Sequence, residues 1–131
     1  MILCSGCFDG LHAGHVAYLQ AVSRVTNQPV YVAVAPDDYI RDRKGTNPRW
    51  GQQDRLAAVR GLRCVQEAFL HGVDGAADVI LKGRVSGAYW HAFAKGKDWQ
   101  RTLPDDVLAA CRETGTALLF VDSGYASHSR D

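Results

Sequence analysis

Five short apolar runs recur along the chain, and segments of helical spacing separate them. Apolar runs without polar alternation are typical of strands that are covered on both faces, as in a parallel sheet. Val30-Tyr31-Val32-Ala33-Val34-Ala35 is the clearest of these runs. We predict strands at residues 1–5, 30–35, 64–70, 89–94 and 116–121.

Between the runs, apolar residues recur every three or four positions, which indicates amphipathic helices. Val16, Leu19 and Val22 form one such stripe, in a helix that begins near His12 or Gly14. Residues 41–49 are polar and mixed in charge, and we interpret them as a loop of a functional site. The predicted helices span residues 12–25, 50–62, 74–82 and 104–114.

This alternation predicts an α/β fold, a three-layer Rossmann-like sandwich with a five-stranded, mainly parallel sheet. At 131 residues, without internal repeats, the chain is expected to form a single domain over residues 1–131. Ligands bind such folds beyond the carboxyl ends of the strands. Polar residues follow the first, second, fourth and fifth predicted strands, so we expect a site at that edge of the sheet.

Composition excludes several classes of function. Apolar residues make up 47% of the chain and charged residues 22%, values that are ordinary for a soluble globular protein. A net charge of +1 gives no electrostatic reason to expect nucleic-acid or membrane-surface binding. No membrane span or signal peptide is visible, so a cytoplasmic location is expected.

Two of the four cysteines form a Cys-x-x-Cys sequence, Cys4-Ser5-Gly6-Cys7. Such a pair occurs in redox sites and as half of a zinc site. No second pair completes a zinc site, and histidines occupy the helix start where a redox pair belongs. We therefore expect Cys4 to be a buried strand residue and Cys7 to lie in the following loop.

Residues 6–15 connect the first strand to the first helix and contain two histidines at the helix entrance. A helix N-terminus offers unpaired backbone N–H groups and a partial positive charge, which attract phosphate. His12 and His15 could donate hydrogen bonds there to the charge that develops during phosphoryl chemistry. The alternatives are an ordinary surface helix start or a metal-binding pair at positions i and i+3.

Gly6-Cys7-Phe8-Asp9-x-x-His12-x-Gly14-His15 resembles the signature of the cytidylyltransferase-like nucleotidyltransferases. Members of this family transfer a nucleoside monophosphate from a nucleoside triphosphate to a phosphate group and release pyrophosphate. Further segments follow in the order that the family shows: Lys44-Gly45, Gln53-x-Arg55, Lys95-Gly96-Lys97-Asp98-Trp99 and Ser127-His128-Ser129-Arg130.

The resemblance implies roles for individual residues. It assigns the catalytic contacts to His12, His15 and Lys44. It assigns the nucleotide contacts to Cys7, Phe8, Asp9, Gly14, Arg55, Lys95, Gly96, Asp98, Trp99, Ser127 and Ser129.

Some of these roles have alternatives within the sequence. Asp9 is also suited to ordering its loop, to holding a metal through water or to capping, and Trp99 to anchoring its loop on the core. The phosphate contact assigned to Arg55 has three alternatives nearby in the sequence, namely Arg41, Arg43 and Arg49.

The resemblance also implies Mg²⁺, because triphosphate is normally handled as its magnesium complex, without a dedicated metal site in the protein. The expected partners are ATP or CTP, a phosphorylated small-molecule acceptor and a second copy of the chain. Transfer of AMP to a sugar such as heptose 1-phosphate is favoured. The alternatives are cytidylyl transfer to glycerol 3-phosphate or a similar phospho-alcohol, and a catalytically weak nucleotide-binding module. His128 and the short tail after it motivate the last.

Overall fold

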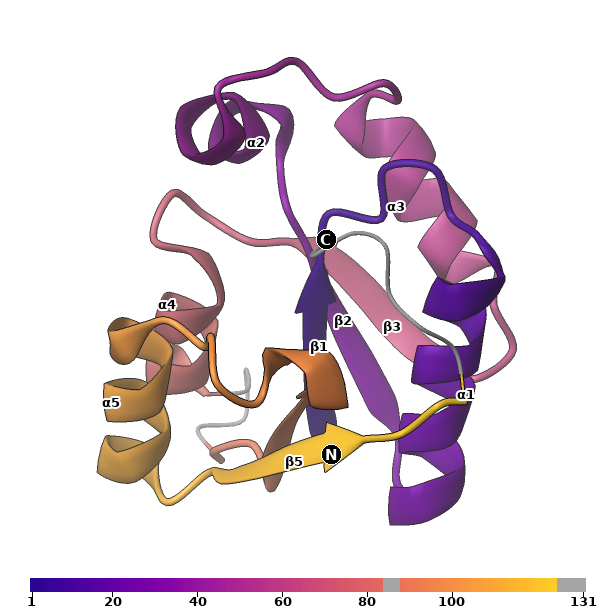
Figure 1. Cartoon of the computed structure of the whole chain (residues 1–131). Coiled ribbons are helices and arrows are strands. Elements are labelled where there is room, and N and C mark those ends of the chain that lie inside the picture. The colour runs from indigo at the N-terminus through magenta and orange to yellow at the C-terminus, as the bar shows by residue number, and fades with distance from the viewer. Residues whose placement is uncertain (84–87, 125–131) are drawn as a thin grey trace.

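The computed structural model describes residues 1–83 and 88–124, which fold into a parallel sheet with helices on both faces (Figure 1). Within these residues the strands are β1 (Ile2–Gly6), β2 (Val30–Val34), β3 (Val65–Leu70), β4 (Ala92–Gly96) and β5 (Ala117–Val121). The helices are α1 (Ala13–Thr26), α2 (Asp37–Lys44), α3 (Gln52–Arg60), α4 (Gly75–Lys82), α5 (Asp105–Thr114) and the short 3₁₀ turn η1 (Lys97–Trp99).

The strand order β3-β2-β1-β4-β5 determines where a ligand can bind. The strand pairs β1–β2, β1–β4, β2–β3 and β4–β5 are all parallel, which confirms the predicted three-layer α/β class. After β1 the chain adds β2 and β3 on one side, and then crosses to add β4 and β5 on the other. The order of strands therefore reverses between β1 and β4, and the crevice at their carboxyl ends is the expected ligand site.

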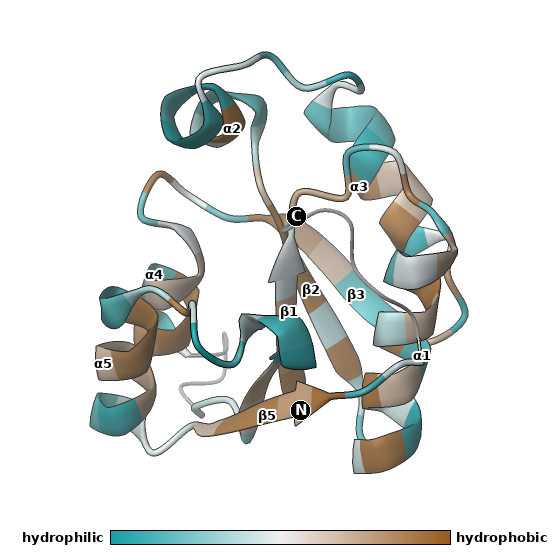
Figure 2. Ribbon diagram, in the orientation of Figure 1, coloured by the Kyte–Doolittle hydropathy of each residue, from teal (hydrophilic) through white to brown (hydrophobic). Residues whose placement is uncertain are grey.

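Two apolar layers hold the helices on the sheet. Leu19 and Val22 of α1 pack with Val59 of α3 on one face, whereas Ile80 of α4 and Val107 of α5 pack on the other. Figure 2 shows apolar stretches along the strands and alternating apolar and polar segments along α1, α3 and α5. Burial on both faces explains why the strands read as unbroken apolar runs.

Helix α2 was not predicted, because residues 41–49 were interpreted as a loop. Only Ile40 of this helix is buried, so no apolar stripe marks it. Its charges nevertheless favour a helix, because Asp37 and Asp38 lie in the first turn and the last turn is basic. The described part of the chain therefore contains five α-helices rather than four, and the loop begins after Lys44.

Strand β4 lies later in the sequence than predicted. It begins at Ala92 rather than at residue 89, and it continues through Lys95 to Gly96. Lys95 was predicted to follow the strand, which was expected to end at residue 94. In the structure the side chain of Lys95 is buried, with 6% exposure.

Among the helices of residues 1–83 and 88–124, none combines the length and the hydropathy that crossing a bilayer requires.

Candidate active site

His12 and His15 form a reciprocal cap on the first turn of α1. His12 is the N-cap residue, and its Nδ1 accepts a hydrogen bond from the backbone N–H of Gly14 at 3.0 Å. Nδ1 of His15 accepts from the backbone N–H of His12 at 3.2 Å. A neutral imidazole with an accepting Nδ1 carries its proton on Nε2. Both rings therefore direct an N–H donor away from the helix backbone, as stabilisation of developing phosphate charge requires.

The two imidazoles lie against each other, with centroids 3.9 Å apart and planes 30° apart. Gly14 makes this arrangement possible. A Cβ at residue 14 would lie 2.8 Å from Cε1 of His12, closer than real Cβ contacts. Any side chain there would displace the His12 ring, so glycine is needed at this position for the cap itself.

Phe8 supports the second imidazole from the core. Its backbone has a φ of +53°, a left-handed conformation that bulky residues rarely adopt. Its ring is buried in the core, with a centroid 5.3 Å from that of His15. The strained backbone is thus fixed by the buried ring, and it turns the chain between β1 and the histidines.

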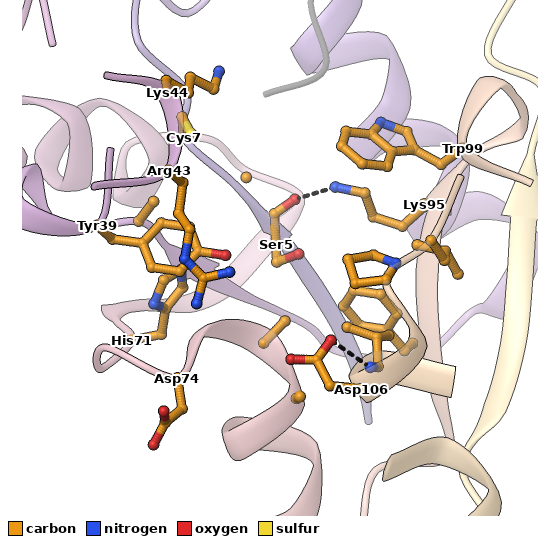
Figure 3. A pocket seen from close by; sticks show the side chains of 18 residues that line it. Ser5, Cys7, Tyr39, Arg43, Lys44, His71, Asp74, Lys95, Trp99 and Asp106 are labelled. Atoms are coloured by element: carbon orange, nitrogen blue, oxygen red, sulfur yellow. Dashed lines mark hydrogen bonds between the residues drawn. The ribbon is translucent and has the colours of Figure 1, made fainter. Parts of the chain in front are cut away.

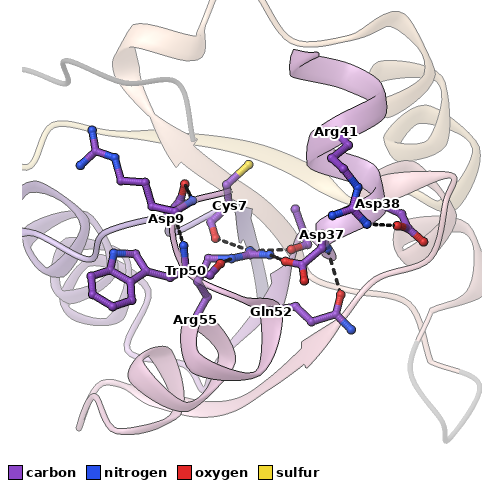
Figure 4. A network of polar contacts seen from close by, with 10 residues as sticks. Cys7, Asp9, Asp37, Asp38, Arg41, Trp50, Gln52 and Arg55 are labelled. Carbon is purple, nitrogen blue, oxygen red and sulfur yellow. Dashed lines mark hydrogen bonds and ion pairs between the residues drawn. The ribbon is translucent and has the colours of Figure 1, made fainter. Parts of the chain in front are cut away.

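Arg55 is not placed as a phosphate ligand, and this corrects the role that the family resemblance implied. Its side chain is 1% exposed and donates to the carbonyl oxygens of Cys7, Ala35 and Trp50 at 2.6–2.8 Å. Its remaining contact is an ion pair with Asp37 at 2.8 Å (Figure 4). The guanidinium therefore braces the ends of β1 and β2 and the starts of α2 and α3.

Asp9 orders the loop that precedes α3, and ordering a loop was one of the roles that the sequence left open for it. Its carboxylate accepts from the backbone N–H groups of Arg49, at 2.8 Å, and Trp50, at 2.9 Å (Figure 4). Both carboxylate oxygens are engaged in this way. Asp9 thereby connects the histidine loop to the segment after α2.

Lys95 bridges the crevice at which the strand order reverses. Its Nζ donates to the carbonyl oxygen of Ser5, at the end of β1, at 2.9 Å. The same ammonium lies 4.4 Å from the ring centroid of Trp99, a cation–π contact. Lys95 and Trp99 therefore lie together at the predicted edge, with Lys95 inside the strand.

The turn after β4 is compact because of Gly96. A Cβ on Gly96 would come within 2.7 Å of Oδ1 of Asp98. The carboxylate of Asp98 thus folds over the backbone at the end of β4. These two residues, predicted to contact the nucleotide, are adjacent at the carboxyl edge.

A cavity of about 350 Å³ opens at the same edge, between α2, α4 and α5 (Figure 3). Of the predicted site residues, Cys7, Lys44, Lys95 and Trp99 line it. Arg43, one of the sequence's alternatives to Arg55 for the phosphate contact, also lines it. The lining contains further residues that we did not single out from the sequence: Tyr39, His71, Phe93, Leu103, Asp106 and Val107.

One of these residues carried a signal in the sequence. His71 directly follows β3, so inspecting the residue after every strand would have found it. The structure places His71 against Tyr39, edge to face with centroids 4.6 Å apart. Burial lowers the pKa of His71, and its ring is therefore neutral near pH 7.

The cysteines are all free thiols. Cys4 is fully enclosed, and burial raises its pKa to about 12, which leaves it protonated and unreactive at neutral pH. As predicted, Cys4 is a buried strand residue and Cys7 belongs to the loop. Ser127 and Ser129 lie outside the described residues.

A search with family models matches residues 3–117 to the family described as "Cytidylyltransferase-like". The chain belongs to this family. The histidine cap, the crevice between β1 and β4 and the adjoining cavity are therefore the candidate site of a chain that belongs to this family.

Curated relatives of two kinds match parts of the chain. FAD synthase of Methanocella paludicola is 37% identical over 73 residues, which are 56% of this chain and 50% of that protein. The bifunctional protein HldE of Shewanella loihica is 41% identical over 66 residues, 50% of this chain and 14% of that protein. The chain thus spans about half the length of the FAD synthase and a small part of HldE.

Solved structures share the fold over nearly the whole chain. A lipopolysaccharide core biosynthesis protein from Thermoplasma volcanium has a TM-score of 0.72 at 22% identity, and the match covers 98% of this chain and 97% of that one. A protein from Archaeoglobus fulgidus gives a TM-score of 0.67 at 15% identity, covering 98% and 93%.

Proposed function

We propose that this protein transfers AMP from ATP to the phosphate of a small phosphorylated acceptor and releases pyrophosphate. The observation that carries the proposal is the histidine cap, which fixes two Nε2–H donors at the N-terminus of a helix. This helix starts at the carboxyl edge of the sheet, where the cavity also opens. Lys44, at the end of α2, and Lys95, at the end of β4, add positive charge there.

The reaction is a single displacement at phosphorus. An oxygen of the acceptor phosphate forms a bond to the α-phosphorus of ATP, and the bond between that phosphorus and the bridging oxygen to the β-phosphate breaks. Pyrophosphate takes the electron pair of the broken bond. Catalysis then consists of alignment and of stabilising the charge on the non-bridging oxygens, the role we give to His12 and His15.

The relatives support adenylyl over cytidylyl transfer. FAD is an adenine dinucleotide, and the adenylyltransferase part of HldE makes ADP-heptose. They differ in acceptor, since one product contains a flavin and the other a sugar. Heptose 1-phosphate, expected from the sequence, and glycerol 3-phosphate with CTP both belong in the test panel.

Mg²⁺ fits this site as a companion of the triphosphate rather than as a resident of the protein. Within residues 1–83 and 88–124, no three His, Cys, Asp or Glu side chains form a metal-binding group. The carboxylate of Asp9 is occupied by backbone N–H groups. When bound, the ion neutralises charge on the phosphate oxygens.

The test is pyrophosphate release with each pairing of ATP or CTP and a phosphorylated acceptor, in the presence of Mg²⁺. We expect turnover with ATP. Turnover confined to CTP would overturn the adenylyl assignment. Tight ATP binding in calorimetry without pyrophosphate release from any pairing would instead identify a nucleotide-binding module.

A further inference from the structure

The cavity between α2, α4 and α5 is chemically divided, and its two parts suit the two parts of one ligand. The part nearest the ends of β1 and β2 carries the cations Arg43, Lys44 and Lys95. The deeper part, between α4 and α5, is lined by the apolar side chains of Ala76, Ala77, Phe93, Leu103 and Val107.

Arg43 is held in place at the cationic end. Its guanidinium carbon lies 4.8 Å from the ring centroid of Tyr39, which in turn packs edge to face on His71. Figure 3 shows Arg43 and Tyr39 together on one wall, opposite Lys95 and Trp99. A guanidinium supported in this way presents a planar fork that matches two oxygens of a phosphate.

The other polar groups of the wall restrict where a charge can lie. Nδ1 of His71 is 2.7 Å from the carbonyl oxygen of Gly72, so it is the donor and Nε2 is left as an acceptor. Asp74, at the start of α4, and Asp106, on α5, add two carboxylates to the lining of the cavity (Figure 3). An anionic group of a ligand is therefore favoured only near Arg43 and Lys44, and a second anionic group elsewhere in the cavity is disfavoured.

Asp106 and Nε2 of His71 could accept hydrogen bonds from hydroxyl groups on their own side of the cavity. Hydroxyl groups that face the alkyl and aromatic side chains of the α4–α5 part would be left without partners. An apolar ring would instead be covered by Phe93 and the α4–α5 side chains.

We propose that the acceptor is a phosphate monoester of an apolar ring compound. Its phosphate binds at Arg43 and Lys44, and its ring enters the apolar part between α4 and α5. This assignment rests on the proposed function, because it names the acceptor class for the same site.

Phenyl phosphate and glucose 1-phosphate are matched probes, since both join one phosphate to one six-membered ring, apolar in the first and hydroxylated in the second. With ATP and Mg²⁺, we expect pyrophosphate release at a KM at least about tenfold lower for phenyl phosphate. FMN serves as a probe with a larger ring system. Calorimetry without ATP measures binding of the same compounds independently of turnover.

Ala76→Leu narrows the apolar part, and we expect it to raise the KM for phenyl phosphate at least about fivefold while leaving the KM for ATP unchanged. Ala58→Leu, at an exposed position of α3, is the matched control. Thermal melting of both variants checks that each is folded.

The two proposals fail in different ways. If glucose 1-phosphate reacts or binds as well as phenyl phosphate, or if neither aromatic phosphate binds, the acceptor assignment is overturned. If phenyl phosphate binds more tightly than glucose 1-phosphate but no pairing of nucleotide and acceptor releases pyrophosphate, the ligand preference of the cavity stands and the proposed function fails.

Discussion

Each histidine of the cap divides its two nitrogens between two tasks. Nδ1 holds the helix start, whereas Nε2 keeps the proton that catalysis would use. The cap fixes the tautomer, because a backbone N–H can only donate. A substitution can therefore remove the Nε2–H donor of a histidine while keeping a hydrogen-bond acceptor in place of Nδ1 at the helix start.

His15→Asn tests this separation. The amide oxygen of asparagine can replace Nδ1 as the acceptor, but the side chain is too short to supply the distal donor. We expect a melting temperature close to that of the unchanged protein and a kcat lower by about 100- to 1,000-fold. A pyrophosphate release rate equal to that of the original chain would exclude a catalytic role for His15.

Gly14→Ala tests the close approach of the His12 ring. Alanine gains about 1 kcal/mol of helix propensity, which roughly offsets the loss of about 1 kcal/mol when the cap breaks. We expect little change in stability and at least a tenfold loss of kcat, an order-of-magnitude estimate for a displaced catalytic group.

Gly61→Ala is the control for this change, because a Cβ there meets only ordinary contacts. It should leave kcat unchanged. A Gly14→Ala variant with full activity would show that the position of the His12 ring is immaterial.

At the scale of elements, Arg55 connects α2 and α3 to the ends of β1 and β2. Arg55→Met removes the guanidinium and leaves three carbonyl oxygens and Asp37 without their partner. We expect the free energy of unfolding in urea to fall by about 3–5 kcal/mol. A phosphate ligand would behave differently, raising the KM for ATP without lowering stability.

Arg60→Met, five residues further along α3, is the matched control for Arg55. Its Nε donates to Glu67 at 3.2 Å and to the carbonyl oxygen of Ala68 at 3.0 Å, and the side chains of Arg60 and Glu67 are about half exposed. A loss below about 1 kcal/mol is expected. Equal losses for the two variants would refute the bracing role of Arg55.

His71 makes the packing of α2 on β3 dependent on pH. Burial lowers its pKa below the value of 6.5 for an exposed histidine, and the nearby Arg43 acts in the same direction. The unfolded chain then binds more protons than the folded one as pH falls below 6.5, so stability decreases through that window. Above about pH 7 the neutral form predominates in both states, and the effect disappears.

His71→Asn can still donate to the carbonyl of Gly72 but does not titrate. Comparing unfolding free energies at pH 7.5 and 5.5, we expect a smaller decrease for the variant. Parallel decreases in the two proteins would show that His71 does not contribute.

The sequence predicts a feature when the residues that produce it are neighbours in the chain, and it does not when they are far apart. The strands and α1 follow from apolar spacing and from caps, which are contained in a few neighbouring residues. Helix α2 has a single buried residue, so periodicity does not reveal it. The place of Arg55 depends on carbonyl groups up to 48 residues away, which leave no mark in the side-chain pattern.

At the scale of the molecule, we predict a homodimer, as the family resemblance implied. Edge strand β5 exposes Leu118, an apolar side chain at the side of the sheet. Light scattering should give twice the chain mass of 14.3 kDa. A mass of one chain at concentrations used for the activity assay would contradict this prediction.

The partners of Arg55 have an evolutionary consequence. Three of its four partners are main-chain carbonyl oxygens, which every amino acid provides. Side chains at those positions can therefore change without removing the contacts that set the course of the loops. A site built in this way can acquire new acceptors by substitution along its rim while the geometry of the transfer centre is inherited intact.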